Sequence, residues 1–149
     1  SFRNFDWGKD INLVCEFNHD HAAINFPGSR VIDEEFKKTI KKDLEISPDG
    51  LIIVELENQR IGFLNMIIRE DIFKNIKYCD VRYVHLIPEY RGKGIGTLMM
   101  KKAQEYAKSK NAKELRLGTH IDNIASIKLY EKMGYKITRV IMTAEVKNE

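Results

Sequence analysis

Three alternating glycines near the middle of the chain constrain the fold more than any other feature. Residues 91–96, RGKGIG, follow an extended apolar run and precede a stretch whose apolar residues recur at helical spacing. Because glycine has no Cβ, its backbone can adopt left-handed dihedral angles and approach a ligand closely. The start of a helix also offers unpaired N–H groups and the positive end of the helix dipole. The pattern therefore predicts a strand, an anion-binding loop and a helix, in that order.

This loop matches neither of the common nucleotide-binding patterns. A Rossmann fingerprint needs glycine where Thr97 stands, and a Walker loop needs four residues between its glycines, followed by Lys-Ser or Lys-Thr. The side chains of Arg91 and Lys93 add positive charge, which suits a pyrophosphate group. Nicotinamide or nucleotide binding and an ordinary glycine-rich turn are the alternatives at this point.

Hydrophobic periodicity elsewhere predicts further helices and strands. Asp33 is expected to cap the second helix and Gly134 to end the last one. The loop 19–30 and the connection 69–77 are expected to contact a substrate, because surface loops carry much of protein function. A single α/β or α+β domain over residues 1–149 follows. The expected elements are helices at 11–17 and 34–46, a hairpin of strands 51–55 and 60–68, a strand at 78–87, a helix from 95, a strand at 115–119, a helix at 123–132 and a β-rich segment at 135–146.

The composition predicts a soluble cytoplasmic protein without a nucleic-acid or membrane partner. Hydrophobic residues make up 43% of the chain and charged residues 32%, which is typical of globular proteins. The 25 basic and 22 acidic residues leave a net charge of only +3, too little for a strong nucleic-acid field. The chain has neither a signal-like first segment nor an apolar run of about 18 residues. Cys15 and Cys79 are far apart in sequence and are expected to be free thiols.

Two stretches carry a more specific pattern: residues 86–96, LIPEYRGKGIG, and residues 122–135, DNIASIKLYEKMGY. In this order they resemble the GNAT superfamily of acetyl-CoA-dependent N-acyltransferases. The resemblance covers residues 50–146, whereas residues 1–49 match only in offering two helices before the sheet. It implies a central mixed, mostly antiparallel, twisted sheet of about six to seven strands, flanked by four helices and splayed at the CoA site.

The resemblance also implies roles for particular residues. Acetyl-CoA would lie between two splayed strands and pass its acetyl group directly to a primary amine of a small molecule or peptide, within a ternary complex. A backbone N–H near Leu86 or Ile87 would stabilise the oxyanion. No metal is expected, because His19 and His21 alone make a poor site. The expected cofactor-binding residues are Leu86, Ile87, Arg91, Gly92, Lys93, Gly94, Ile95, Gly96, Thr97, Asn123, Ser126 and Tyr130.

Two residues are expected to carry the chemistry, again from the resemblance. Tyr130 matches the tyrosine that protonates the departing CoA thiolate, and Asp80 matches a position that holds the base in several family members. A bulge in this strand would bring Tyr83 or His85 to the same side as the amine. Strict alternation places Asp80, Arg82, Val84 and Leu86 on one face of the strand and Cys79, Val81, Tyr83, His85 and Ile87 on the other.

Several interpretations stay open in the sequence. Asn123 could be an ordinary helix N-cap as well as a cofactor ligand. Arg82 could bind an acceptor carboxylate or form an ion pair within the fold. Some relatives that acetylate protein N-termini carry glutamate where this chain has Gly118, which disfavours that substrate class. A noncatalytic acyl-CoA-binding module is the main alternative function, and association into a homodimer is left open.

Overall fold

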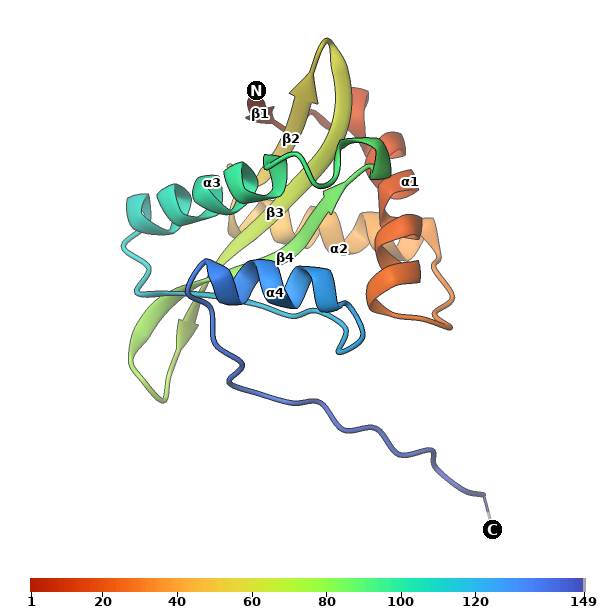
Figure 1. Cartoon of the computed structure of the whole chain (residues 1–149), viewed down its shortest axis with the longest axis vertical. Helices are drawn as coiled ribbons and strands as arrows, with labels where there is room; N and C mark the ends of the chain where they lie inside the picture. The colour runs from red at the N-terminus through yellow and green to blue at the C-terminus, as the bar shows by residue number, and fades with distance from the viewer. Residues whose placement is uncertain (149) are drawn as a thin grey trace.

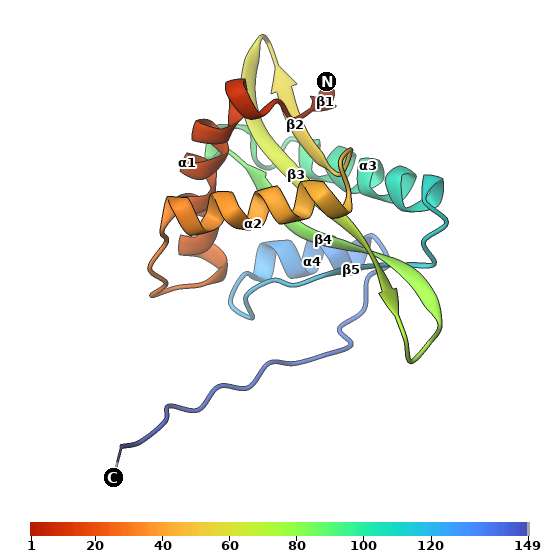
Figure 2. The ribbon, with the colours of Figure 1, turned by 180° about the vertical axis from the view of Figure 1, so that it is seen from behind.

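The structure, a computed structural model, describes residues 1–148 and arranges them as one sheet between two helical layers. Helices α1 and α2 cover one face, and α3 and α4 cover the other (Figures 1 and 2). The strands are β1 (Phe2–Asn4), β2 (Leu51–Leu56), β3 (Gln59–Asp71), β4 (Ile76–Leu86) and β5 (Glu114–Leu117). The helices are α1 (Trp7–Asn25), α2 (Asp33–Ile46), α3 (Ile95–Ser109) and α4 (Ile124–Lys132), with a 3-10 turn, η1, at Pro88–Tyr90.

The sheet has the order β1-β2-β3-β4-β5. The first three pairings are antiparallel, and β5 pairs with β4 in parallel after the crossover through α3. A two-residue turn joins β2 to β3, and both of its residues, Glu57 and Asn58, have positive φ values of 53° and 63°. Such turns match the right-handed twist of the strands they join. The mixed, mostly antiparallel sheet and the four flanking helices confirm the expected fold class.

A bulge in β4 decides which side chains face which helical layer. Asn65 of β3 pairs with Tyr83, but the next residue, Met66, pairs with Val81, so Arg82 is an extra residue. Before the bulge, Val81 packs on the α3 side of the sheet, and after it, Leu86 packs on that same side. Strict alternation was therefore wrong for this strand. The bulge places Asp80, Arg82, Tyr83 and His85 together on the face covered by α1 and α2.

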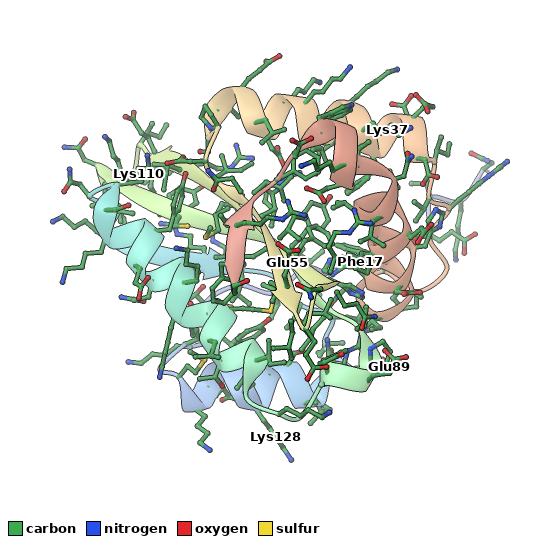
Figure 3. All side chains as sticks on the ribbon, turned by 90° about the horizontal axis from the view of Figure 1, so that it is seen from above. Phe17, Lys37, Glu55, Glu89, Lys110 and Lys128 are labelled. Atoms are coloured by element: carbon green, nitrogen blue, oxygen red, sulfur yellow. The ribbon has the colours of Figure 1, made fainter. Side chains whose placement is uncertain are left out.

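Each face of the sheet has its own apolar core. Phe17, labelled in Figure 3, lies between α1 and the sheet, where it stacks on Phe63 with ring centroids 6.1 Å apart. The other core lies between the sheet and α3 and includes Met99 and Met100. The cysteines are free thiols, Cys15 in the first core and Cys79 in the second. Burial raises the pKa of both, that of Cys79 to about 12.

A charged network fixes the start of α1 to the sheet. The carboxylate of Asp10 is fully buried and accepts hydrogen bonds from Arg3 Nη1 (2.7 Å) and Nη2 (2.9 Å). It also accepts from the Asp6 N–H (2.8 Å) and from Arg60 Nη1 (3.2 Å). Burial alone would raise the pKa of Asp10, but these bonds outweigh it and lower the pKa to about 2. The network therefore holds a buried charge that is fully hydrogen-bonded.

The helices and strands differ from the sequence predictions in several places. Helix α1 continues to Asn25, so residues 19–25 are helical and not a loop; their alanines and the buried His21 support a longer helix. Asp33 is the first residue of α2, and the N-cap is Ile32. Strand β1 was not predicted, because three residues are too few to show a period. The 69–77 connection is mostly strand, since β3 and β4 form one long hairpin.

The predicted β-rich segment 135–146 forms no strand within the described residues, so the sheet has five strands there and not six or seven. Tyr135 still packs against the α3-side core, but the chain after it runs away from the sheet (Figure 1). The large apolar side chains of this tail, among them Ile141 at 96% exposure, are exposed. Strand propensity depends on a neighbour to pair with, and in this arrangement the segment has none.

Candidate active site

The glycine-rich loop is shaped for an anion. Gly92 and Gly94 have φ values of 75° and 83°, a left-handed conformation that favours glycine. Gly94 is the N-cap of α3, so the N–H groups of the first turn, Ile95 to Thr97, open toward solvent at the positive end of the helix. Lys93 lies over the Tyr90 ring at 5.4 Å. The structure thus places residues 91–97 as a compact group of donors and positive charge.

A gap opens beside this loop because β4 and β5 diverge. Their pairing ends at Val81 and Leu117, although β4 continues to Leu86. On its other edge, β4 stays paired with β3, and the Ile87 N–H donates to Ile61 O at 2.8 Å. Hydrogen bonding alternates along an antiparallel pair, so the backbone groups of Val84 and Leu86 point away from β3 and into the gap.

Protein groups lie against both residues whose carbonyls face the gap. Arg91 Nε donates to Leu86 O at 2.8 Å, and His21 lies near the Val84 backbone, which partly opposes the lowering of the His21 pKa by burial. The N–H groups of Val84 and Leu86 are left facing the gap. Of the two backbone donors named from the sequence, Leu86 is available and Ile87 is used within the sheet. Val84 was missed, because its donor emerges only from the register of β3 and β4.

The end of α1 bridges the gap on the side opposite the glycine-rich loop. Asn25, the last residue of α1, accepts hydrogen bonds from Thr119 Oγ1 (3.1 Å) and from the His120 N–H (3.4 Å), both in the connection after β5. Its side-chain amide also lies 3.4 Å from His21 Nδ1. His21 in turn packs on β4, against the ring of Tyr83. Side-chain contacts through the end of α1 therefore connect the two diverging strands.

Two buried histidines lie beside the gap on the α1 side. His85 is 3% exposed, its ring lies 5.2 Å from that of Phe17, and its Nε2 has no hydrogen-bond partner among residues 1–148. The ring of His21 lies 5.2 Å from that of Tyr83 and 6.4 Å from that of His85. Burial lowers the pKa of both histidines to about 4. Both imidazoles are therefore neutral at pH 7.

Acidic and basic side chains are paired farther along the same face of β4. Asp80 accepts from Arg69 Nε at 2.9 Å. The Asp43 carboxylate of α2 lies 3.0 Å from Arg82 Nε and accepts from Asn65 Nδ2 at 2.8 Å. Burial raises the pKa of Asp43 above its usual value, although Arg82 and Asn65 oppose that shift. Arg82 thus forms an ion pair within the fold, the second of the two interpretations that the sequence left open.

Helix α4 supplies the remaining candidate residues from the other side of the gap. Asn123 is its N-cap and accepts from the Ser126 N–H at 3.4 Å, so the capping interpretation is correct. Tyr130 packs at the edge of the α3-side core, 5.7 Å from the Tyr135 ring. The phenol of a tyrosine is protonated at neutral pH, and burial raises the pKa of Tyr130 further. Such a phenol can act as a proton donor.

The structure gathers most of the predicted residues around one gap, but His19 lies outside it. His19 pairs with Asp33 at 2.8 Å on the exposed surface, away from His21. Within residues 1–148, no three His, Cys, Asp or Glu side chains are grouped as a metal site would require. None of the helices in the same range is long and apolar enough to cross a bilayer. An anion loop, two gap-facing N–H groups and a protonated tyrosine thus form the candidate site.

Comparisons with known proteins agree with this arrangement. The sequence profile of the Acetyltransferase (GNAT) family matches residues 14–135, so the chain belongs to the GNAT acetyltransferase family. An N-acetyltransferase of Methanocaldococcus jannaschii is 31% identical over 113 residues, which cover 71% of this chain and 46% of the relative. N-alpha-acetyltransferase 30 of Schizosaccharomyces pombe is 30% identical over 84 residues, 55% of each chain. The matches span about half the length of these relatives.

Solved structures share the fold at low sequence identity. A GNAT family acetyltransferase of Staphylococcus aureus superimposes with a TM-score of 0.69 at 22% identity, covering 98% of both chains. An aminoglycoside N-acetyltransferase solved in complex with CoA gives a TM-score of 0.75 at 16% identity, covering 99% of this chain and 95% of the other. At these identities the likeness establishes the fold, and the chemistry has to be argued from the site.

Proposed function

We propose that this protein transfers an acetyl group from acetyl-CoA to a primary amine of a small molecule or peptide. The observation that carries the proposal is the pair of N–H groups, Val84 and Leu86, that face the gap beside the anion loop. Amide groups of the CoA arm can pair with such an exposed strand edge, and its pyrophosphate can bind the N–H groups of residues 91–97. A noncatalytic acyl-CoA-binding module would need the same loop, but not a proton donor such as Tyr130.

The direction of the arm follows from the position of the loop. The pyrophosphate lies beyond the end of β4, so the arm runs back along the strand, past Leu86 and toward Val84. The thioester end would then lie at Val84, whose N–H is placed to stabilise the oxyanion formed on attack. Because the cofactor, α3 and α4 fill the other side, the amine approaches from the face covered by α1 and α2.

The proton transfers can be assigned to groups on the two sides of the gap. As the amine nitrogen bonds to the acetyl carbon, it loses a proton, and as the C–S bond breaks, the sulfur takes one. Tyr130, on the α4 side, donates to the sulfur. Asp80 lies four residues before Val84, about 13 Å along the strand at about 3.3 Å per residue. It would therefore receive the amine proton through water molecules and not directly.

Ligand binding tests the cofactor assignment before any acceptor is known. Thermal unfolding should shift upward with CoA but not with NAD or ATP, since a ligand at 100 times its Kd adds about 2.7 kcal/mol of stability. Replacing Gly94 by Val should weaken CoA binding by at least about 10-fold, because a branched residue cannot adopt φ 83° without moving the loop.

A matched control separates this effect from a loss of stability. Gly94→Val should also cost about 1–2 kcal/mol of stability, the usual penalty for a left-handed side chain. Gly118→Ala introduces a Cβ into open space at a glycine outside the left-handed region and should leave CoA binding unchanged. If Gly94→Val binds CoA as tightly as the parent protein, the loop is not the pyrophosphate site.

A further inference from the structure

The hydrogen-bond chain at the end of α1 lies where the acyl group of the cofactor would end. His21 lies near the backbone of Val84, the residue whose N–H faces the gap at the thioester position. His21 is 8% exposed, and the rings of Tyr83 and Phe26 lie 5.2 Å and 6.3 Å from its ring. The imidazole thus lies between these two rings, beside the gap.

Asn25, at the end of α1, connects this ring to the segment that follows β5. Its Oδ1 accepts from Thr119 Oγ1 and from the His120 N–H, and its amide nitrogen lies 3.4 Å from His21 Nδ1 and 3.2 Å from His21 O. The side chain is therefore tied at both ends and cannot swing away without breaking these bonds. Because His120 and Thr119 follow β5 directly, Asn25 also limits how far the two strands can separate.

We propose that His21, held by Asn25, limits the acyl group to a short chain. The proposal rests on acyl-CoA binding in the gap as described above. The acetyl group has to face the α1 side, because the amine approaches from there. A longer acyl chain on the same carbon would therefore extend from Val84 toward the His21 ring. Two further methylene groups would meet this fixed ring, whereas an acetyl methyl ends before it. His21 and Asn25 are thus specificity-determining residues that no motif in the sequence marks.

Local electrostatics agree with a ring placed against an apolar chain. A charged imidazolium would be costly to leave beside a methyl group in a closed gap. Burial lowers the pKa of His21 to about 4, so the ring is neutral at pH 7, and the amide nitrogen of Asn25 lies 3.4 Å from its Nδ1. The rings of the titratable residues Tyr83 and His85 of β4 lie 5.2 Å and 6.4 Å from it.

Binding of three ligands tests the proposal without an acceptor. Calorimetry would give the Kd values of CoA, acetyl-CoA and butanoyl-CoA for the parent protein and for His21→Ala. The parent should bind butanoyl-CoA at least about 10-fold more weakly than acetyl-CoA, the discrimination that pocket size usually supplies. In His21→Ala this difference should disappear, while the Kd for CoA, which has no acyl group, stays the same.

Control variants make the outcome specific to the ring position. His19→Ala removes an exposed histidine from the same helix, and should keep the parent's discrimination. Asn25→Ala frees the His21 ring without removing it, and should reduce the discrimination in part; it also decides the question if His21→Ala does not fold. A merely structural role would weaken all three ligands equally and leave the ratio of Kd values unchanged.

Two results would overturn the proposal. Either the parent binds butanoyl-CoA as tightly as acetyl-CoA, or His21→Ala and Asn25→Ala both keep the parent's ratio of Kd values. A parent protein that binds none of the three ligands would contradict the proposed function itself. The CoA measurement therefore separates failure of the cofactor assignment from failure of the size limit.

Discussion

At the scale of single residues, Tyr130 offers the sharpest test of the chemistry. A tyrosine phenol is protonated at neutral pH, and burial raises the pKa of Tyr130 further, so its proton is available for the departing sulfur. Tyr130→Phe removes one oxygen and keeps the ring. We expect kcat to fall about 100-fold with little change in the KM for acetyl-CoA, the pattern of an interaction made in the transition state. Steady-state kinetics would show this, and an unchanged kcat would exclude Tyr130 as the acid.

Asp80 makes a different prediction because it acts at a distance. Its carboxylate is bound to Arg69, and it lies too far from Val84 for direct transfer. Asp80→Asn should lower the rate at neutral pH and recover part of it at alkaline pH, where solvent can deprotonate the amine. A pH–rate profile is the measurement. If the profile of Asp80→Asn matches the parent's, the proton leaves by another route, and His85, with its unpaired Nε2, is the next residue to replace.

At the scale of elements, Gly62 allows the backbones of β3 and β4 to approach closely beside the gap. A Cβ at this position would lie 2.2 Å from His85 O, and a backbone atom cannot yield as a flexible side chain can. Gly62→Ala should therefore destabilise the protein by about 1–3 kcal/mol. Chemical denaturation would measure the loss. Gly118→Ala, where the added Cβ meets nothing within 4 Å, is the control and should change stability little.

The sequence predicted the elements whose hydrophobic periodicity continues over many residues or that end at a clear stop signal. Helix α3, the β2–β3 hairpin and the end of α4 at Gly134 all agree with the structure, since glycine there has a φ of 97°. The glycine-rich loop before α3 was predicted for the same reason, and the role of residues 91–97 in cofactor binding stays a prediction. The residues that escaped prediction act through tertiary contacts: the Val84 N–H depends on strand register, and Asn25 depends on a residue 94 positions away. Neither leaves a local pattern.

The bulge at Arg82 shows how one residue changes a whole strand. Alternation alone assigns Asp80 and Leu86 to the same face, and a single inserted residue reverses the assignment beyond it. The expectation that a bulge could bring Tyr83 or His85 to the amine's side named the right feature, although its position could not be read from the sequence. By contrast, residues 135–146 have a composition that favours a strand, but they form none because no neighbouring strand pairs with them.

At the scale of the whole molecule, the buried titratable groups predict how stability changes with pH. His21 and His85 have pKa values of about 4 in the folded state and about 6.5 when unfolded. Above pH 6.5 these two histidines do not reduce the free energy of unfolding. As the pH falls from 6.5 to 4, the free energy of unfolding decreases, because the unfolded chain binds protons that the folded chain does not. Each histidine should account for roughly 3 kcal/mol of this loss of stability.

Asp10 extends the loss to lower pH. The pKa of Asp10 is about 2 in the folded protein. Its contribution to the free energy of unfolding is therefore complete above about pH 4 and is lost as the pH falls toward 2. Urea unfolding at a series of pH values should thus show two successive declines. His85→Gln should remove about half of the first decline, whereas His19→Gln, at an exposed site, should leave it intact. A single decline centred below pH 4 would show that the histidines are not buried as described.

The burial of the two cysteines has a practical consequence for measuring turnover. Acyl transfer from acetyl-CoA releases one free thiol for each amine modified, and coloured reagents detect thiols through the thiolate form. Cys15 and Cys79 are buried with raised pKa values, so both react slowly in the native protein. Colour that develops at neutral pH therefore reports CoA released by the reaction. In denaturant the same reagent counts two thiols for each chain, which makes it a direct gauge of how much protein is unfolded.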